Sequence, residues 1–245
     1  MRPLRFFLHF SSRPLRHRSG HFCSPFESDF VVGYAQSGLR FGATMVTPQF
    51  IPVAGGKMSL DSLVAIGETA VDNVNIRVLD SAGRTVEGCD YTWNDYMYDD
   101  PCWVNADFEK VEDISFAAGQ GLWVYGSSAD EGLQSAGQVG TNDVTVTLRF
   151  GATPTGNPFP VSIDLQDIIA TGDTAVDNVN IRVLDSAGRT VEGSDYTWND
   201  YMYDDPCWVN ADFEKVEGVS FAPGQGLWVY GSSDSEGLCF PAPEL

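Results

Sequence analysis

Residues 69–133 read TAVDNVNIRVLDSAGRTVEGCDYTWNDYMYDDPCWVNADFEKVEDISFAAGQGLWVYGSSADEGL, and residues 174–238 repeat this block at a constant offset of 105 positions. The copies differ at six places, namely Cys89/Ser194, Asp113/Gly218, Ile114/Val219, Ala118/Pro223, Ala129/Asp234 and Asp130/Ser235. A period of this length is typical of a duplicated, domain-sized module. The fold to be explained is therefore that of one module that occurs twice.

Within the block, apolar and polar residues alternate in short runs, as they do in half-buried β-strands. Two such runs flank the turn sequence DSAG and predict a β-hairpin over residues 74–93. No periodicity of 3.6 residues is sustained from residue 30 onwards, so the sequence predicts an all-β protein. The remaining short strands of the block are expected at residues 102–104, 114–116 and 122–125.

The duplication extends upstream of the block, because the hexapeptide LRFGAT at residues 39–44 returns at residues 148–153. The sequence around this hexapeptide has diverged between the copies, while the block has not. We therefore predict two tandem, sandwich-like antiparallel modules, at residues 30–138 and 139–245. They follow a segment of different composition, residues 1–29.

The segment at residues 1–29 is rich in Arg and Ser, and its apolar patch is too short for a signal-peptide core. Its composition is similar to that of an organelle transit peptide. Our preferred interpretation is a mis-annotated start codon, with translated upstream sequence in place of a true signal peptide. We expect the segment to be disordered and to contribute nothing to the fold.

The charge of the chain limits its partners. The net charge is −20, and residues 1–29 contain five arginines against two acidic residues, so the remainder carries −23. Such an acidic body repels phosphate backbones, which argues against nucleic-acid binding. The chain contains no run of 18 or more apolar residues, so the sequence predicts no transmembrane helix.

Histidine and cysteine exclude several kinds of catalytic site. The three histidines, His9, His17 and His21, all precede the modules. Ser-His-Asp or Cys-His catalysis and histidine-ligated metals are therefore excluded from the modules. Among the five cysteines, only Cys102 and Cys207 occupy equivalent positions, so the copies cannot share an intramodule disulfide. The pairs Cys89–Cys102 and Cys207–Cys239 stay open as alternatives.

The loop NDYMYDD, at residues 94–100 and 199–205, is the most distinctive candidate site. Clustered carboxylates on a loop suit Ca²⁺, and exposed tyrosine rings suit stacking on sugars. The alternative is a solvated loop whose Asp and Asn side chains cap turns. The candidate calcium ligands are Asp95, Asp99, Asp100, Asp200, Asp204 and Asp205. The candidate sugar-binding residues are Tyr96, Tyr98, Tyr201 and Tyr203.

The six tryptophans also lie in the repeated block and could in principle offer sugar-binding platforms. A small sandwich, however, needs large side chains to fill its interior. Trp123, on an alternating strand, is most simply explained as a core residue.

The turn-strand signature GQGLWV, at residues 119–124 and 224–229, resembles that of tandem β-rich modules in uncharacterised bacterial secreted or cell-surface proteins. The element GNPFP at residues 156–160 is similar to one found in the same modules. This resemblance implies a β-module and export, and it brings no catalytic residues with it.

Together these features predict a non-enzymatic, exported repeat protein with a structural or adhesive role at the cell surface. Its expected partners are extracellular polysaccharide or other surface proteins. One alternative is a pair of carbohydrate-binding modules, assisted by Ca²⁺, which would be the only cofactor. A third is a small glycoside-acting enzyme that uses paired carboxylates, such as those of Asp95, Asp99, Asp100, Glu109 and Glu112.

Overall fold

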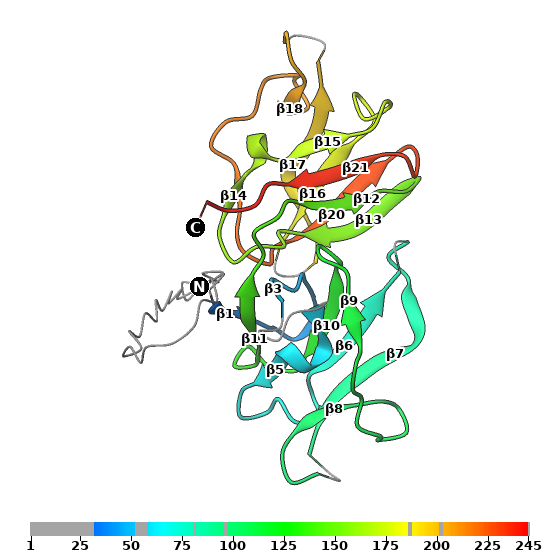
Figure 1. The fold of residues 1–245 in the computed structure, drawn as a ribbon, viewed down its shortest axis with the longest axis vertical. Coiled ribbons are helices and arrows are strands. Elements are labelled where there is room, and N and C mark those ends of the chain that lie inside the picture. Colours follow the sequence, from blue (N-terminus) through cyan, green and yellow to red (C-terminus); the bar gives the residue numbers. More distant parts are fainter. Residues whose placement is uncertain are drawn as a thin grey trace, which may run out of the picture.

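The structure is a computed structural model, which describes residues 32–51, 58–80, 82–95, 98–185, 188–200 and 203–244 (Figure 1). In this part of the chain, β-strands alternate with turns, and the helices are two three-residue 3-10 turns, η1 (Leu60–Ser62) and η2 (Leu165–Asp167). The predicted all-β class is therefore confirmed. The segment at residues 1–29 lies outside the described residues. Among those that are described, no helix is of a length and hydrophobicity that would cross a bilayer.

The first module contains a five-stranded antiparallel sheet in the order β2-β10-β6-β7-β8. A second sheet has the order β1-β11-β3, with β5 also paired to β11, and β4 pairs with β9. The strands are β1 (Val32–Gly38), β2 (Gly42–Val46), β3 (Phe50–Ile51), β4 (Met58–Ser59), β5 (Leu63–Ile66), β6 (Asn75–Leu79), β7 (Thr85–Asn94), β8 (Cys102–Val104), β9 (Ser115–Phe116), β10 (Leu122–Gly126) and β11 (Gly132–Val139).

The second module repeats this plan and lies beside the first (Figure 1). Its five-stranded sheet has the order β13-β20-β16-β17-β18, and it is accompanied by a three-stranded sheet, β12-β21-β15, and by the pair β14-β19. The strands are β12 (Val144–Thr147), β13 (Gly151–Gly156), β14 (Ile163–Asp164), β15 (Ile169–Thr171), β16 (Asn180–Leu184), β17 (Thr190–Asn199), β18 (Cys207–Val209), β19 (Ser220–Phe221), β20 (Gly226–Gly231) and β21 (Gly237–Phe240).

The hairpin predicted over residues 74–93 is formed by β6 and β7. Ile76 faces Tyr91, and the register shifts between Arg77 and Leu79, where β7 carries extra residues. Gly88 lies in this bulge with φ 75°, a backbone conformation that favours glycine. β16 and β17 pair with the same shift, so the near-identical sequences of the two hairpins give the same register.

Each module has its own core, which lies on the inner face of its five-stranded sheet. In the first module Ile76, Leu122 and Val124 are fully buried, and their counterparts in the second module are buried equally. The two buried clusters contain residues of one module each. At about 25 cal/mol per Å² of buried apolar surface, these clusters are the main source of stability in either module.

The modules differ most at their last strand. β11 continues to Val139 and pairs with β1, β5 and β3, whereas β21 stops at Phe240. Pro241 follows Phe240 directly and Pro243 comes two residues later, and both lack the N–H group that a continued ladder would require. The sheet built on β21 is therefore narrower than the sheet built on β11.

Candidate functional site

The loop NDYMYDD connects β7 to β8 in the first module and β17 to β18 in the second. Of the four candidate tyrosines, Tyr96 and Tyr201 lie outside the described residues. Tyr98 and Tyr203 are half-buried. The six candidate aspartates, Asp95, Asp99, Asp100, Asp200, Asp204 and Asp205, are all exposed.

The hydroxyl groups of Tyr98 and Tyr203 hold the loop against a neighbouring turn. The backbone N–H of Lys110 donates to Tyr98 Oη at 2.7 Å, and the N–H of Lys215 donates to Tyr203 Oη at 2.8 Å. The turn that receives Tyr98 is itself fixed by Asn105 Oδ1, which accepts from two backbone N–H groups at 3.0 Å. Both loop tyrosines therefore have a structural role in the module.

The exposed aspartates of the loop do not converge with other ligands. Over the part of the chain that the structure describes, no three or more His, Cys, Asp or Glu side chains gather in a way that could hold a metal ion. The predicted calcium ligands have not been tested by any observation of binding, and Ca²⁺ stays a prediction. Asp72, next to the loop, uses its carboxylate to accept from the amide of the buried residue Asn94.

Trp93 and Trp103, on either side of the loop, pack into the core, as the sequence predicts. Trp123, which the sequence also predicts as a core residue, is instead half-buried on the outer face of its sheet, where it faces Gly188 of the second module. Trp103 is 3% exposed, and its Nε1 donates to the carbonyl of Leu63 at 2.7 Å. Trp93 packs edge-on against it, with ring centroids 5.1 Å apart. The second module repeats this pair with Trp198 and Trp208. An indole whose N–H is satisfied inside the core offers no platform to a ligand.

The cysteines are free thiols throughout the described part of the chain. Neither of the disulfide pairs left open by the sequence is formed. Burial raises the pKa of the Cys102 and Cys207 thiols, and the nearby Lys110 and Lys215 offset this only in part. A thiol with a raised pKa is a poor nucleophile at neutral pH.

Each module contains a buried carboxylate that the sequence analysis missed. It lies in the turn that follows β10 in the first module and β20 in the second. Glu131 is 2% exposed and accepts from Ser127 N at 2.6 Å, Ser127 Oγ at 2.7 Å and Thr69 Oγ1 at 2.8 Å. Burial alone would raise its pKa, but these hydrogen bonds outweigh burial and lower the pKa below its usual value. Glu236 repeats the arrangement with Ser232 and Thr174.

The second feature missed in the sequence is the junction between the modules. Its apolar centre consists of Met45, Leu79 and Leu184, with Trp123 and Trp228 packed against them. These side chains come from the outer faces of the two five-stranded sheets. The modules are thus joined by an apolar contact in addition to the linker.

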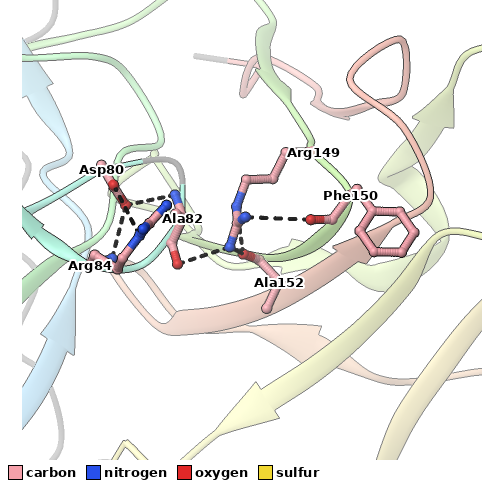
Figure 2. Close-up of polar contacts among 6 residues, drawn as sticks. All are labelled: Asp80, Ala82, Arg84, Arg149, Phe150 and Ala152. Carbon is pink, nitrogen blue, oxygen red and sulfur yellow. Dashed lines mark hydrogen bonds and ion pairs between the residues drawn. The ribbon is translucent and has the colours of Figure 1, made fainter.

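A hydrogen bond from Arg149 crosses this junction. Figure 2 shows its guanidinium between two carbonyl groups, that of Ala82 in the first module at 2.9 Å and that of Ala152 in the second at 2.8 Å. Asp80 presents the Ala82 turn, because its Oδ1 accepts from the backbone N–H groups of Ala82 and Arg84 at 2.7 and 2.9 Å. A charged donor on a backbone carbonyl makes a strong contact of defined direction.

Comparison with known proteins identifies no relative: no protein family, curated protein or solved structure matches this chain. The candidate sites therefore rest on the geometry described above.

Proposed function

We propose that this chain is a non-enzymatic repeat protein, exported to the cell surface, where it acts as an adhesive or structural element. The proposal is supported by the resemblance of GQGLWV to exported β-modules and by modules without histidine. It is also supported by the structural role of the loop tyrosines, of the core tryptophans and of the buried glutamates, which all make hydrogen bonds or packing contacts within their own module.

The observation that carries the proposal is a pair of exposed phenylalanines at equivalent positions. Phe41 is 82% exposed and Phe150 is 79% exposed. Both belong to LRFGAT, the hexapeptide that stays identical in the diverged part of the duplication. A ring exposed to this extent adds little to either core, so its retention in both copies favours a role in contact with a partner.

The local backbone explains how each ring is held outwards. Gly42, which follows Phe41, has φ 101°, and Gly151, which follows Phe150, has φ 94°. A Cβ at either glycine would meet no atom within 4 Å, so glycine is required there for its backbone conformation. The preceding arginine spans the same turn, with Arg40 Nη2 donating to the Ala43 carbonyl at 3.1 Å.

Two equivalent apolar contacts on one chain suit adhesion. Each ring alone offers a small apolar surface, but the second contact forms at a high effective concentration once the first is made. The proposed partners are other surface proteins or extracellular polysaccharide, since aromatic rings pack against apolar side chains and against sugar rings.

The test uses fluorescent beads that carry the full chain, mixed with intact cells of the organism that encodes it. We expect beads with the double variant F41S/F150S to bind several-fold less than wild type. The matched control is V64S/I169S, which removes two other exposed apolar side chains at equivalent positions and should leave bead binding unchanged. F41S/F150S should keep the wild-type Tm, because both rings are largely exposed, and V64S/I169S should lower it only slightly, because its side chains are about half exposed.

Equal bead binding by wild type and F41S/F150S would contradict the adhesive role, and the failure of an antiserum to label intact cells would contradict export. A glycan array decides the alternative. A defined glycan bound by wild type and lost in F41S/F150S would replace the adhesive function with a carbohydrate-binding pair. If that pair is assisted by Ca²⁺, EDTA should lower the Tm of the full chain, and an unchanged Tm would remove calcium from the account.

A further inference from the structure

Two pairs of contacts between the modules are reciprocal. A Cβ added at Gly83 of the first module would lie 2.8 Å from the Trp228 ring of the second. A Cβ added at Gly188, the counterpart of Gly83, would lie 2.8 Å from the ring of Trp123, the counterpart of Trp228. Each module therefore places the same glycine turn against the same tryptophan of the other.

A second reciprocal pair lies closer to the centre of the junction. Gly121 packs against Pro154, with a Cβ position 3.2 Å from the proline, and its counterpart Gly226 packs against Met45, with a Cβ position 2.8 Å away. Met45 and Pro154 are equivalent, because each is the fourth residue of its five-stranded sheet's edge strand, β2 or β13. The glycine of each module thus contacts the edge strand of the other module.

Reciprocity of this kind is the property of an isologous interface, which is formed by two copies of one surface related by a two-fold axis. Two domains that pack through unrelated surfaces have no reason to show it. The junction therefore has the geometry of a homodimer interface whose two subunits are joined by a short linker between β11 and β12.

The glycine turns and the tryptophans belong to the near-identical block, whereas the edge strands β2 and β13, which contact Gly226 and Gly121, have diverged in sequence. Thr155 in the second module donates through Oγ1 to the Gly119 carbonyl at 2.6 Å. Its counterpart is Val46, which has no hydroxyl group, and the contact from that side is a longer one, Thr47 N to Gly224 O at 3.4 Å. We call the half supplied by β13, which has the side-chain hydrogen bond, the stronger half, and the half supplied by β2 and Thr47, which has the longer backbone contact, the weaker half.

We propose that this face is a self-complementary pairing surface and that the partner it fits is a second copy of the same module. Two copies of the second module would form the stronger half twice. In such a pair, Gly188 of one copy would take the place of Gly83 against Trp228 of the other. Gly226 would likewise take the place of Gly121 against Pro154. Two copies of the first module would form the weaker half twice. This inference is independent of the proposed adhesive function.

The test begins with the full chain carrying a protease recognition sequence between Thr141 and Asn142, both of which are exposed. The folded chain is cut, and its oligomeric state is followed by light scattering coupled to gel filtration and by native mass spectrometry. We expect the halves to remain paired at micromolar concentration. On mixing with isotope-labelled cut chain, pairs of two second modules should form alongside the mixed pairs.

Two matched variants should affect the mixed pair and the pair of second modules differently. Trp123→Ala should weaken the mixed pair by about 30-fold or more, as expected for a central aromatic contact, and should leave the pair of second modules unchanged. Trp228→Ala should weaken the mixed pair similarly and should abolish the pair of second modules, because it removes the ring from both sides.

Three results would overturn the proposal. The first is a pair of folded halves that separate on cutting, and the second is exchange that yields mixed pairs alone. The third is loss of the strand signal in circular dichroism on cutting, which would mean that the chain is a single interdependent fold and that its halves are not associating modules.

Discussion

The two modules have the same backbone conformation at equivalent positions, but their residues differ in how well they suit that conformation. At the bend before β9 the first module has Asp113 at φ 64°, where the second module has Gly218 at φ 70° before β19. In the turn before β10 the first module has Ala118, where the second has Pro223. At both places the second module carries the residue that the backbone conformation prefers. These two differences therefore mark places where the first module is less well suited to the shared fold.

The largest expected effect concerns a feature that the modules share. Glu131→Gln or Glu236→Gln places an amide N–H₂ among hydroxyl and backbone donors, and each variant should lose about 2–3 kcal/mol of unfolding free energy. Urea unfolding followed by tryptophan fluorescence measures the loss. A loss in one module without a comparable loss in the other would break the equivalence of the two sites.

The same substitution has a pH dependence of known sign. The folded-state pKa of Glu131 is lowered from its usual value of 4.5, so its stabilising effect is fully present above that pH. The effect is lost as the pH falls through the lowered folded-state pKa. The difference in stability between wild type and Glu131→Gln should therefore be constant from pH 5 to 7 and shrink as the pH falls below about 4.

The bend before β9 offers the next effect. Asp113→Gly should stabilise the first module by about 1 kcal/mol, because glycine adopts a positive φ without the steric cost that a Cβ brings. Gly218→Asp should destabilise the second module by a similar amount. Asp113→Ala is the control that removes the charge and keeps the Cβ. If it stabilises as much as Asp113→Gly, charge rather than backbone conformation explains the difference between the modules.

A smaller effect is expected at the loop tyrosines. Tyr98→Phe and Tyr203→Phe should each cost about 0.5–1 kcal/mol, since the lost hydrogen bond lies where water can reach the freed N–H. Thermal unfolding of the two variants and of the double variant measures the cost, which should be additive. A variant with wild-type stability would show that the hydroxyl does not fix the loop.

The smallest effect lies in the turn before β10. Gln120 N donates to the Ala117 carbonyl at 3.0 Å, and Gly119 has φ 79°, which places Ala118 where a type II turn favours proline. Ala118→Pro should raise stability by about 0.5 kcal/mol, chiefly by restricting the unfolded chain. Pro223→Ala should lower it equally, and a Tm that falls in Ala118→Pro would contradict this account of the difference.

Much of the fold could be predicted from the sequence because its signals are local. The alternation over residues 74–79 and the turn that follows it are sufficient to predict the β6–β7 hairpin. The tryptophan-rich block likewise predicts that Trp103 and Trp208 are core residues. Short-range pattern and side-chain size decide both, and neither depends on how the modules are arranged. The same prediction is wrong for Trp123, which packs at the junction.

The parts that the sequence could not predict depend on contacts between distant residues. The role of Tyr98 depends on a backbone N–H at Lys110, which shows no side-chain signal. Glu131 accepts from Thr69, 62 residues earlier in the chain. Its one visible signal is that SSxxEG stays constant while both residues before the glutamate change. The contact between Gly83 and Trp228 joins the two modules, so no sequence pattern within one module could predict it.

The reciprocity of the junction can be tested directly by a nuclear Overhauser spectrum of the full chain with labelled glycine and tryptophan. One Hα of Gly83 points towards the Trp228 ring, and one Hα of Gly188 points towards the Trp123 ring. Both cross-peaks should be present, each with its Hα shifted upfield by the ring. The presence of only one cross-peak, or of neither, would contradict a two-fold arrangement of the modules.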